Sequence, residues 1–210
     1  MKYANVIFDM DGVLIDNSAG IMHSVRYALG RLGVAVPDET VLRKFIGPAL
    51  VWSLKTYCHL SEADAERGLK IYREMYSAEG INMYRLYDGV YDTVKTLAIG
   101  GVRLSVASGK PQIFLDKILE TSGMSRFFER TAGVDFTEKE SSKAAQIHRA
   151  LISRPALMVG DRIFDIDCAR GEDVDCAFAK YGFGDESDYA EHKPRYFIDQ
   201  PSDLLGIVFG

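Results

Sequence analysis

The sequence contains few cysteines, and they show no pairing pattern. The 210-residue chain has three, Cys58, Cys168 and Cys176, an odd number without a CxxC pair. Isolated cysteines of this kind are typical of reduced, mostly buried thiols rather than of a disulfide framework. The four histidines are scattered and lack the spacing of zinc ligands. The sequence therefore offers no thiol or imidazole centre, and we expect a cytoplasmic protein.

Long hydrophobic runs and a surplus of positive charge are also absent. No apolar stretch approaches the length of a membrane span, and residues 1–5 lack the apolar region of a signal peptide. Lys plus Arg number 25 against 30 for Asp plus Glu, so the net charge is -5. This balance gives no basic patch for nucleic acid or an anionic membrane surface. We expect neither partner, and the composition leaves the oligomeric state open.

The order of apolar patterns along the chain predicts an α/β fold. A first strand at residues 4–8 is followed by about sixty residues of helical pattern. Beyond Gly89, short apolar strands alternate with helices. Such alternation predicts a Rossmann-like parallel sheet with both faces covered. We assign residues 1–15 and 83–210 to this α/β core and residues 16–82 to an inserted helical block.

The individual elements follow from the same patterns, because apolar residues at helical spacing and likely turn residues mark their limits. Ser18 and Ser61 are predicted N-caps in the helical block. Helices are predicted near residues 18–33, 38–45, 49–58 and 61–78, and then near 91–99, 111–121, 141–152, 163–171 and 201–208. The later strands are predicted at 102–107, within 127–133, and at 156–159, 174–179 and 196–198.

The first strand ends in two aspartates, Asp9 and Asp11, followed by Gly12. Side chains spaced i, i+2 at a strand end project to the same side of the chain. Two like charges held so close repel each other unless a cation or a proton relieves them. On these residues alone, an acidic turn and a catalytic site are equally good interpretations.

Other polar side chains follow later strands of the predicted sheet. Ligands bind such sheets at the carboxyl ends of the strands. Ser108-Gly109-Lys110 follows the strand at 102–107, and Asp161 and then Asp165 follow the strand at 156–159. We expect these groups to converge on Asp9 and Asp11. Carboxylates beside a hydroxyl and an ammonium group suit metal-assisted phosphoryl transfer through an aspartate nucleophile and a hard cation such as Mg²⁺.

Four separated motifs carry a family resemblance that extends over essentially the whole chain. They are Asp9-Met10-Asp11-Gly12-Val13-Leu14, Leu104-Ser105-Val106-Ala107-Ser108, Ser141-Ser142-Lys143-Ala144 and Val159-Gly160-Asp161-Arg162-Ile163-Phe164-Asp165. In this order they resemble the haloacid-dehalogenase-like hydrolases. The phosphoglycolate-phosphatase-like branch is the most similar, on Phe45-Ile46-Gly47-Pro48, Ser108-Gly109-Lys110-Pro111 and Tyr181-Gly182-Phe183-Gly184.

The resemblance implies catalytic and phosphate-binding roles. Asp9 would be the nucleophile that becomes phosphorylated, and Asp11 would be the general acid/base. Ser108 and the N–H of Gly109 would hold the transferring phosphoryl group. Lys143 would neutralise the charge of the phosphoaspartyl group.

The resemblance also implies a magnesium site and a lid. Asp161 would bind Mg²⁺ directly, together with Asp9 and the backbone carbonyl of Asp11. Asp165 would act through a metal-bound water or by orienting Lys143. The insertion at residues 16–82 stands where the family has a small helical cap over the site.

Three residues leave the substrate open. Val13 stands where many phosphatases have threonine, and a valine there also occurs in the β-phosphoglucomutase branch. Lys110 either contacts a substrate phosphate or is a solvated residue at the start of a helix. Arg43, in the cap, either reaches a substrate phosphate or carboxylate or is an ordinary surface residue.

The leading hypothesis is a Mg²⁺-dependent phosphomonoester hydrolase that acts on a small phosphorylated metabolite. Phosphoglycolate and nucleoside monophosphates are the candidate substrates. The first alternative is a phosphosugar mutase of the β-phosphoglucomutase kind, which uses the same aspartates. A non-enzymatic alternative is a receiver-like phosphate-sensing module, although a receiver has no use for a lid.

Overall fold

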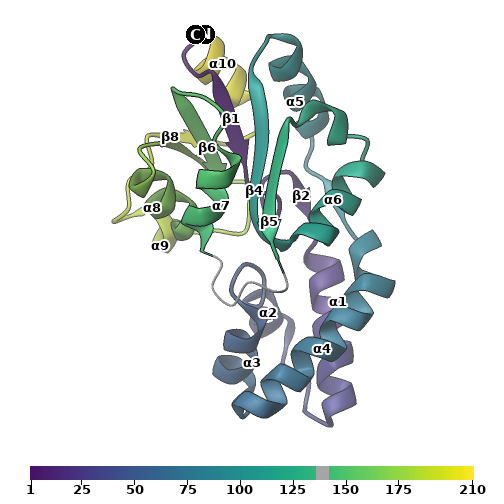
Figure 1. Cartoon of the computed structure of the whole chain (residues 1–210). Coiled ribbons are helices and arrows are strands. Elements are labelled where there is room, and N and C mark those ends of the chain that lie inside the picture. Colours follow the sequence, from purple (N-terminus) through teal and green to yellow (C-terminus); the bar gives the residue numbers. More distant parts are fainter. Residues whose placement is uncertain (136–141) are drawn as a thin grey trace. The chain divides into compact units, whose positions relative to one another are not determined.

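The computed structural model describes residues 1–135 and 142–210. The chain divides into two compact units (Figure 1). One comprises Met1–Asp16 and Leu86–Gly210, and the other comprises Asn17–Arg85. We call them the core unit and the helical unit.

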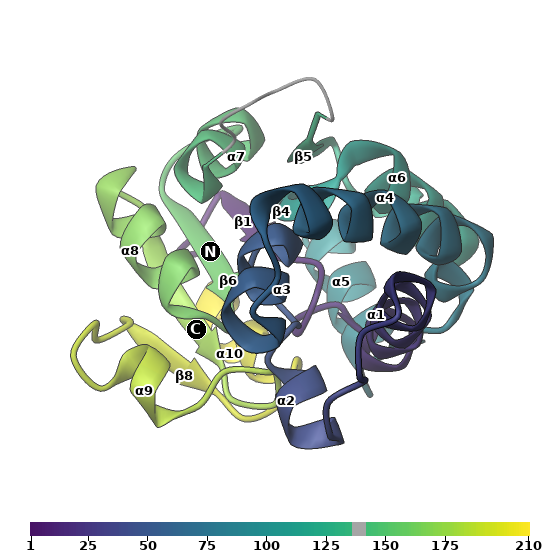
Figure 2. The same cartoon turned by 90° about the horizontal axis from the view of Figure 1, so that it is seen from below.

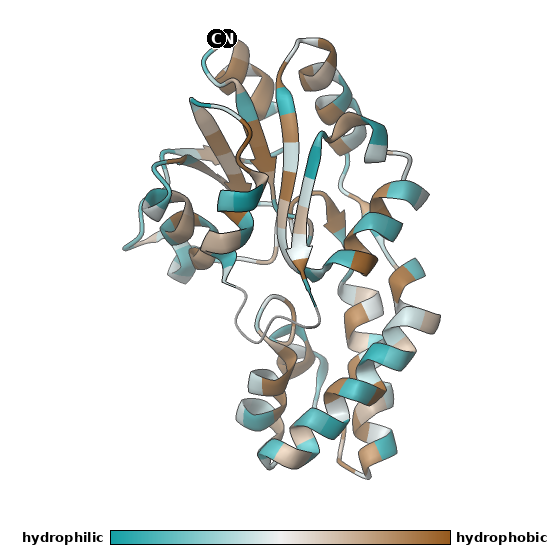
Figure 3. Cartoon of the chain, viewed as in Figure 1, coloured by the Kyte–Doolittle hydropathy of each residue, from teal (hydrophilic) through white to brown (hydrophobic). Residues whose placement is uncertain are grey.

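A six-stranded sheet in the order β5-β4-β1-β6-β7-β8 forms the centre of the core unit. All of its strand pairs are parallel. The central strands are largely hydrophobic in Figure 3, as expected where helices cover both faces. The predicted fold class is therefore confirmed. The strands are β1 Asn5–Phe8, β4 Arg103–Pro111, β5 Arg130–Val134, β6 Ala156–Gly160, β7 Asp175–Ala179 and β8 Tyr196–Ile198.

Helices lie on both faces of this sheet (Figure 2). Helices α7 (Lys143–Ala150) and α8 (Ile163–Gly171) pack on one face, where Ile147 and Ile166 join a buried cluster with Met158 of β6. The other face is covered by α5 Val90–Ile99, α6 Gln112–Thr121 and α10 Asp203–Phe209. The predicted start of α7 at Ser141 lies outside the described residues.

Strand β1 is the point at which the strand order reverses. From β1 the sheet extends through β4 to β5 on one side, and the chain then returns to form β6 on the other side of β1. Ligands bind at the carboxyl edge of an α/β sheet where its strand order reverses in this way. Asp9 directly follows β1 and therefore lies at this position.

Strand β4 extends beyond the predicted end at residue 107. Ala107 pairs with Ala132 of β5, and Pro111 pairs with Val134. Three residues of β4, Ser108-Gly109-Lys110, therefore oppose a single residue of β5, Gly133. This is a β-bulge, in which extra residues leave the regular ladder before pairing resumes. We call these three residues the β4 bulge.

The helical unit contains α1 Ser18–Leu32, α2 Glu39–Arg43, α3 Leu50–Cys58, α4 Glu62–Ala78 and the short 3-10 helix η1 Gly80–Asn82. The predicted cap at Ser61 is confirmed, since its hydroxyl accepts the N–H of Asp64 at 3.1 Å. The predicted cap at Ser18 is wrong. Ser18 is the first helical residue, and Asn17 is the N-cap. The sequence pattern could not distinguish them, because asparagine and serine both suit the N-cap position.

Several short elements complete the fold. Strands β2 (Ile15–Asp16) and β3 (Arg85–Leu86) form a separate two-stranded sheet where the chain leaves and re-enters the core unit. The 3-10 helix η2 Ser125–Phe127 precedes β5, and α9 Glu186–Tyr189 precedes β8. None of the described helices has both the length and the apolar character needed to span a membrane.

Candidate active site

Asp9 is held in place by backbone contacts at the end of β1. Its N–H donates to the carbonyl of Val159 in β6 at 2.9 Å, so the residue stays attached to the sheet edge. Its Oδ1 accepts the N–H of Met10 at 2.7 Å and lies 3.0 Å from Nζ of Lys143. The carboxylate therefore has a fixed orientation and a cationic partner.

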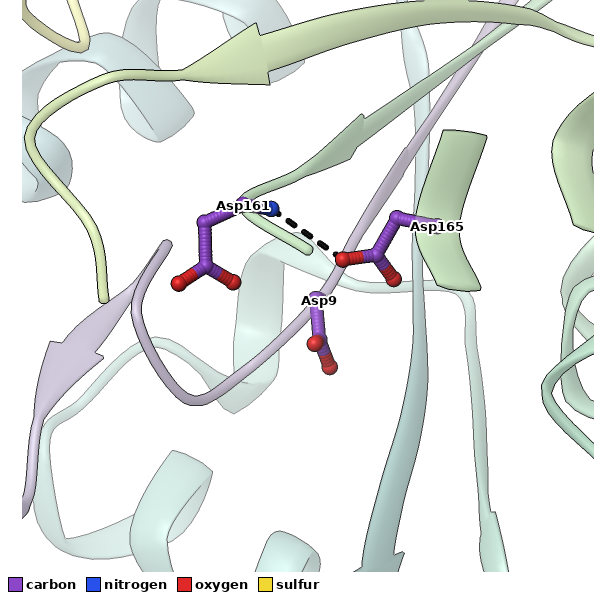
Figure 4. Close-up of side chains that lie close together, drawn as sticks. All are labelled: Asp9, Asp161 and Asp165. Carbon is purple, nitrogen blue, oxygen red and sulfur yellow. Dashed lines mark hydrogen bonds between the residues drawn. The ribbon is translucent and has the colours of Figure 1, made fainter. Parts of the chain in front are cut away.

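Two further carboxylates converge on Asp9, as the strand ends predict (Figure 4). Asp161 follows β6, and Asp165 lies in the first turn of α8. Carboxylate oxygens of Asp9, Asp161 and Asp165 all lie within 4.8 Å of one another. Both Asp161 and Asp165 are only 1% exposed. Three like charges in so small and dry a volume require compensation.

Asp165 organises the neighbouring groups. Its Oδ2 accepts the N–H groups of Asp161 at 3.1 Å and Arg162 at 3.0 Å, which shapes the turn between β6 and α8. Its Oδ1 lies 2.8 Å from Nζ of Lys143. Because both oxygens already have partners, Asp165 is better suited to orienting Lys143 than to direct metal binding.

Lys143 is the ammonium group of this cluster. It is the first residue of α7, whose N-cap Ser142 accepts the N–H of Ala145 at 3.2 Å. Burial alone would lower the pKa of Lys143, but the negative charges of Asp165 and Asp9 outweigh it and raise the pKa. Lys143 is therefore a permanent positive charge beside Asp9.

The surroundings of Asp161 give the clearest indication that the site fits a cation. Its Oδ2 accepts the N–H of Phe183 at 2.7 Å, whereas its buried Oδ1 has no hydrogen-bond partner. Burial, followed by the charges of Asp165 and Asp9, raises the pKa of Asp161 well above its usual value. A buried carboxylate oxygen without a partner is costly, and a divalent cation would remove that cost. The donor set thus fits a hard metal ion such as Mg²⁺, which prefers oxygen ligands.

Glycines allow the backbone to close around Asp161. Gly12 has a positive φ of 82°, and a Cβ added there would lie 2.1 Å from Oδ2 of Asp161. A Cβ on Gly182 would lie 2.5 Å from Cβ of Asp161. The glycine in the first motif and the Gly182-Phe183-Gly184 loop after β7 therefore form a close-fitting wall around this carboxylate.

Asp11 lies next to a second lysine, Lys110, rather than Lys143. Its Oδ2 lies 3.1 Å from Nζ of Lys110, and its Oδ1 is buried without a hydrogen-bond partner. The side chain of Lys110 is only 5% exposed, so its interpretation as a solvated residue is wrong. The chain places Lys110 in the β4 bulge, where its side chain is directed inward to Asp11 instead of outward to water.

The remaining predicted site residues lie in two places. Ser108 is 2% exposed in the β4 bulge, and its Oγ accepts the N–H of Lys110 at 3.2 Å. Gly109 is exposed at the same turn, and a Cβ added there would meet no neighbour within 4 Å. Arg43 lies on α2 of the helical unit, where it is exposed and pairs with Glu39 at 2.9 Å. Its contact with substrate stays a prediction.

Sequence reasoning missed two contributions to this site. The convergence of Lys110 on the two aspartates was expected, but its pairing with Asp11 rather than Asp9 was not. The backbone N–H of Phe183 was also missed, because a backbone donor leaves no side-chain pattern. The two glycines that flank Phe183 were the available sign that its backbone approaches another group closely.

Comparisons with known proteins agree with this geometry. Residues 6–179 match the family model described as haloacid dehalogenase-like hydrolase. The chain belongs to this family. A 5'-nucleotidase from Pseudomonas aeruginosa is 33% identical over 94% of this chain and 91% of that protein. The tyrosine-protein kinase PtkA from Mycobacterium tuberculosis is 36% identical over 85% of this chain and 62% of that protein.

A solved structure supports the same assignment. The crystal structure of a protein described as a predicted phosphatase from Clostridium acetobutylicum superposes with a TM-score of 0.91 at 30% identity. The match covers 100% of this chain and 99% of that one. The hydrolase family, together with the 5'-nucleotidase and the relative described as a phosphatase, identifies the chain as a phosphatase, which favours the enzymatic hypothesis over a receiver-like module.

Proposed function

We propose that this phosphatase is a Mg²⁺-dependent phosphomonoester hydrolase that acts on a small phosphorylated metabolite through an aspartyl-phosphate on Asp9. One observation carries the proposal. The Asp9 carboxylate, at the carboxyl end of the central strand, lies within 4.8 Å of two other carboxylates and 3.0 Å from Lys143. This arrangement suits a nucleophile that must approach an anionic phosphoryl group.

The first half of the reaction transfers the phosphoryl group to the protein. An Asp9 carboxylate oxygen attacks phosphorus, and the bond from phosphorus to the leaving oxygen breaks. Asp11 gives its proton to that oxygen, so the product leaves as an alcohol. Ser108 and the N–H of Gly109 hold the phosphoryl oxygens during transfer. Lys143 balances the charge that the phosphoryl group adds to Asp9.

The second half regenerates the protein. Asp11, now ionised, takes a proton from a water molecule whose oxygen attacks the phosphorus of the aspartyl-phosphate. The bond between phosphorus and the Asp9 oxygen breaks, and inorganic phosphate leaves. Mg²⁺, held by Asp9, Asp161 and the backbone carbonyl of Asp11, would supply positive charge to the phosphoryl oxygens throughout.

The helical unit acts as a cap in this proposal. Closing a lid before transfer removes bulk water, and admitting one water afterwards permits hydrolysis. A small cap of this kind favours metabolites over phosphoproteins or nucleic acids. Arg43 of the cap would bind a phosphate or carboxylate of the substrate.

Two observations bear on the substrate class. The 5'-nucleotidase relative favours a nucleoside 5'-monophosphate, whereas the branch resemblance favours phosphoglycolate. The mutase alternative rests on Val13, whose side chain is 1% exposed and therefore also serves as a core residue. All three possibilities are separated by measuring which compounds release phosphate.

A metabolite panel with an inactive variant tests the proposal. Phosphate release with Mg²⁺ is measured for phosphoglycolate, nucleoside 5'-monophosphates, sugar phosphates and phosphotyrosine. The same panel is run with Asp9→Asn, after its thermal unfolding has confirmed that the variant folds. We expect release by the wild type and none above background by Asp9→Asn, since asparagine is no nucleophile here.

Two outcomes would contradict the proposal. Mg²⁺-dependent release by Asp9→Asn would show that another group is the nucleophile. Little release by the wild type, together with isomerisation of a sugar phosphate that requires a bisphosphate, would identify a mutase.

A further inference from the structure

Gly133 of β5 faces the β4 bulge directly. It is the single residue that opposes Ser108-Gly109-Lys110 in the strand register. A Cβ added to Gly133 would lie 2.7 Å from Cα of Gln112 and 2.8 Å from the carbonyl oxygen of Lys110. Both contacts are with backbone atoms, which cannot rotate away as a side chain would. The bulge and Gly133 are therefore in close backbone contact.

Gln112 fixes this contact from the side of the bulge. It begins α6, directly after Pro111, and its Oε1 accepts the N–H of Gly133 at 2.6 Å. Its Nε2 donates to Oδ1 of Asp116 at 2.7 Å and to Oγ1 of Thr131 at 2.9 Å. One amide thus ties the end of the bulge to β5 and to the next turn of α6.

Arg149 holds the opposite side of Gly133. It lies in the last turn of α7, and its Nη2 donates to the carbonyl oxygen of Gly133 at 2.6 Å. The first residue of the same helix is Lys143, which pairs with Asp9 and Asp165. An α-helix of eight residues is stiff, so the position of its last turn constrains the position of its first.

We propose that Gln112 and Arg149 are positioning residues that hold Gly133 from both sides and so fix the β4 bulge relative to Lys143. This inference rests on the proposed function, because it gives the bulge and Lys143 the task of holding one phosphoryl group. Ser108 and Gly109 lie in the bulge, whereas Lys143 lies on α7. Gln112, just after the bulge, and Arg149, on α7, therefore bind the backbone N–H and C=O of the same glycine.

Replacing Gln112 or Arg149 should therefore lower turnover without a large loss of stability. A displacement of about 1 Å at catalytic groups can cost on the order of 10²-fold in rate. Neither Gln112 nor Arg149 is among the groups placed against the phosphoryl group. Their removal would misplace the bulge relative to Lys143 rather than remove a reacting group.

The test uses Gln112→Met and Arg149→Met, singly and together, in the whole 210-residue chain. Arg130→Met is the matched control. Arg130 also binds α7, donating to the carbonyl oxygens of Arg149 at 3.2 Å and Leu151 at 2.9 Å, but no described contact joins it to Gly133. Turnover on the best substrate of the panel, the unfolding temperature and the inhibition constant of inorganic phosphate with Mg²⁺ are measured for each protein.

We expect each single variant to lower kcat by about tenfold and to weaken inhibition by phosphate, whereas Arg130→Met changes neither beyond about twofold. The double variant should lose about as much as one single variant, since both side chains hold the same glycine. Arg149→Lys, which keeps a donor, should restore part of the loss.

Three results would overturn the inference. Unchanged kcat in Gln112→Met and Arg149→Met is one. Fully multiplicative losses in the double variant are another. A loss in Arg130→Met equal to that in Arg149→Met would show that general support of α7 is responsible. A wild type that releases phosphate from no compound contradicts the proposed function itself, so the two failures are distinguishable.

Discussion

The two aspartates after β1 occupy different environments although a single residue separates them. Oδ1 of Asp9 has two partners, the N–H of Met10 and the ammonium group of Lys143, whereas Asp11 has one described partner, Lys110 at its Oδ2. The other oxygen of Asp11 is buried and has no hydrogen-bond partner. A rigid carboxylate suits a nucleophile, and a carboxyl oxygen without a partner suits proton transfer. These surroundings support the proposed division of roles between the pair.

This division predicts the effect of Asp11→Asn. Asparagine keeps an oxygen that Lys110 can bind, but it cannot carry the catalytic proton. We expect kcat on an alkyl phosphate to fall by about 10² to 10⁴. In single-turnover experiments, release of p-nitrophenol from p-nitrophenyl phosphate should fall much less, because that leaving group needs no proton. Equal losses in leaving-group release from both esters would contradict the role of Asp11 as the acid.

At the scale of elements, α9 supports the start of α8 and so the turn that carries Asp161 and Asp165. Asp188 of α9 is 6% exposed. Its Oδ1 accepts the N–H of Ile163 at 3.0 Å and Nε–H of Arg162 at 3.1 Å. The carboxylate thus caps α8 from outside that helix. Removing it leaves donors at the N-terminus of α8 without their partner.

We therefore expect Asp188→Ala to lower the free energy of unfolding by about 1–3 kcal/mol and to weaken Mg²⁺ binding. Ser61→Ala is the control, because it removes the N-cap of α4 in the helical unit and should cost about 1 kcal/mol. Urea unfolding and Mg²⁺ titration calorimetry measure both quantities. Equal Mg²⁺ affinities in the two variants would refute the link from α9 to the carboxylate cluster.

The elements also show what a sequence reveals about a fold. Strands β1 and β6 were predictable because residues 6–8 and 156–159 are apolar runs within a sheet that helices cover on both faces. The β4 bulge was not, because its polar and glycine residues end the apolar pattern, whereas backbone pairing resumes beyond them at Pro111 and Val134. Helix α9 has four residues, too few for any periodicity, and forms through the reciprocal capping of Asp185 and Asp188.

Within the site, too, the residue pattern predicted some contacts and not others. Convergence of Asp9, Asp161 and Asp165 was predictable, since parallel strands place their carboxyl ends at one edge of the sheet. The partner of Lys110 depends on the path of the bulge, which the residue pattern does not encode. The N–H of Phe183 depends on a loop whose backbone, rather than its side chains, contacts Asp161.

At the scale of the whole molecule, the core unit is assembled from two separate stretches of sequence. Residues 1–16 supply β1 and Asp9, the proposed nucleophile, and residues 86–210 supply the other strands of the main sheet. Strands β2 and β3 pair with each other, so the chain leaves and re-enters the core unit at neighbouring points. A sheet with adjacent exit and entry points tolerates a long insertion without a change in its own pairing.

The buried carboxylates also predict how the stability of the whole protein depends on pH and metal. Because the folded-state pKa of Asp161 is raised, the unfolded chain loses this proton first as the pH rises. The folded state then binds more protons, so the contribution of Asp161 to the stability of the metal-free protein falls from about pH 4 upward until Asp161 ionises in the folded state. The raised pKa of Lys143 does not alter this, since its contribution to stability is lost only at strongly alkaline pH.

We expect Mg²⁺ to reverse this trend, because it binds the ionised form of Asp161 and stabilises the folded state by mass action. The unfolding temperature is measured between pH 5.5 and 8 in EDTA and in Mg²⁺, for the wild type and Asp161→Asn. The stabilisation by Mg²⁺ should grow with pH in the wild type. In EDTA the variant should gain stability over the wild type as the pH rises, since asparagine needs no counter-charge. Stabilisation of Asp161→Asn by Mg²⁺ as large as that of the wild type would show that the ion binds elsewhere.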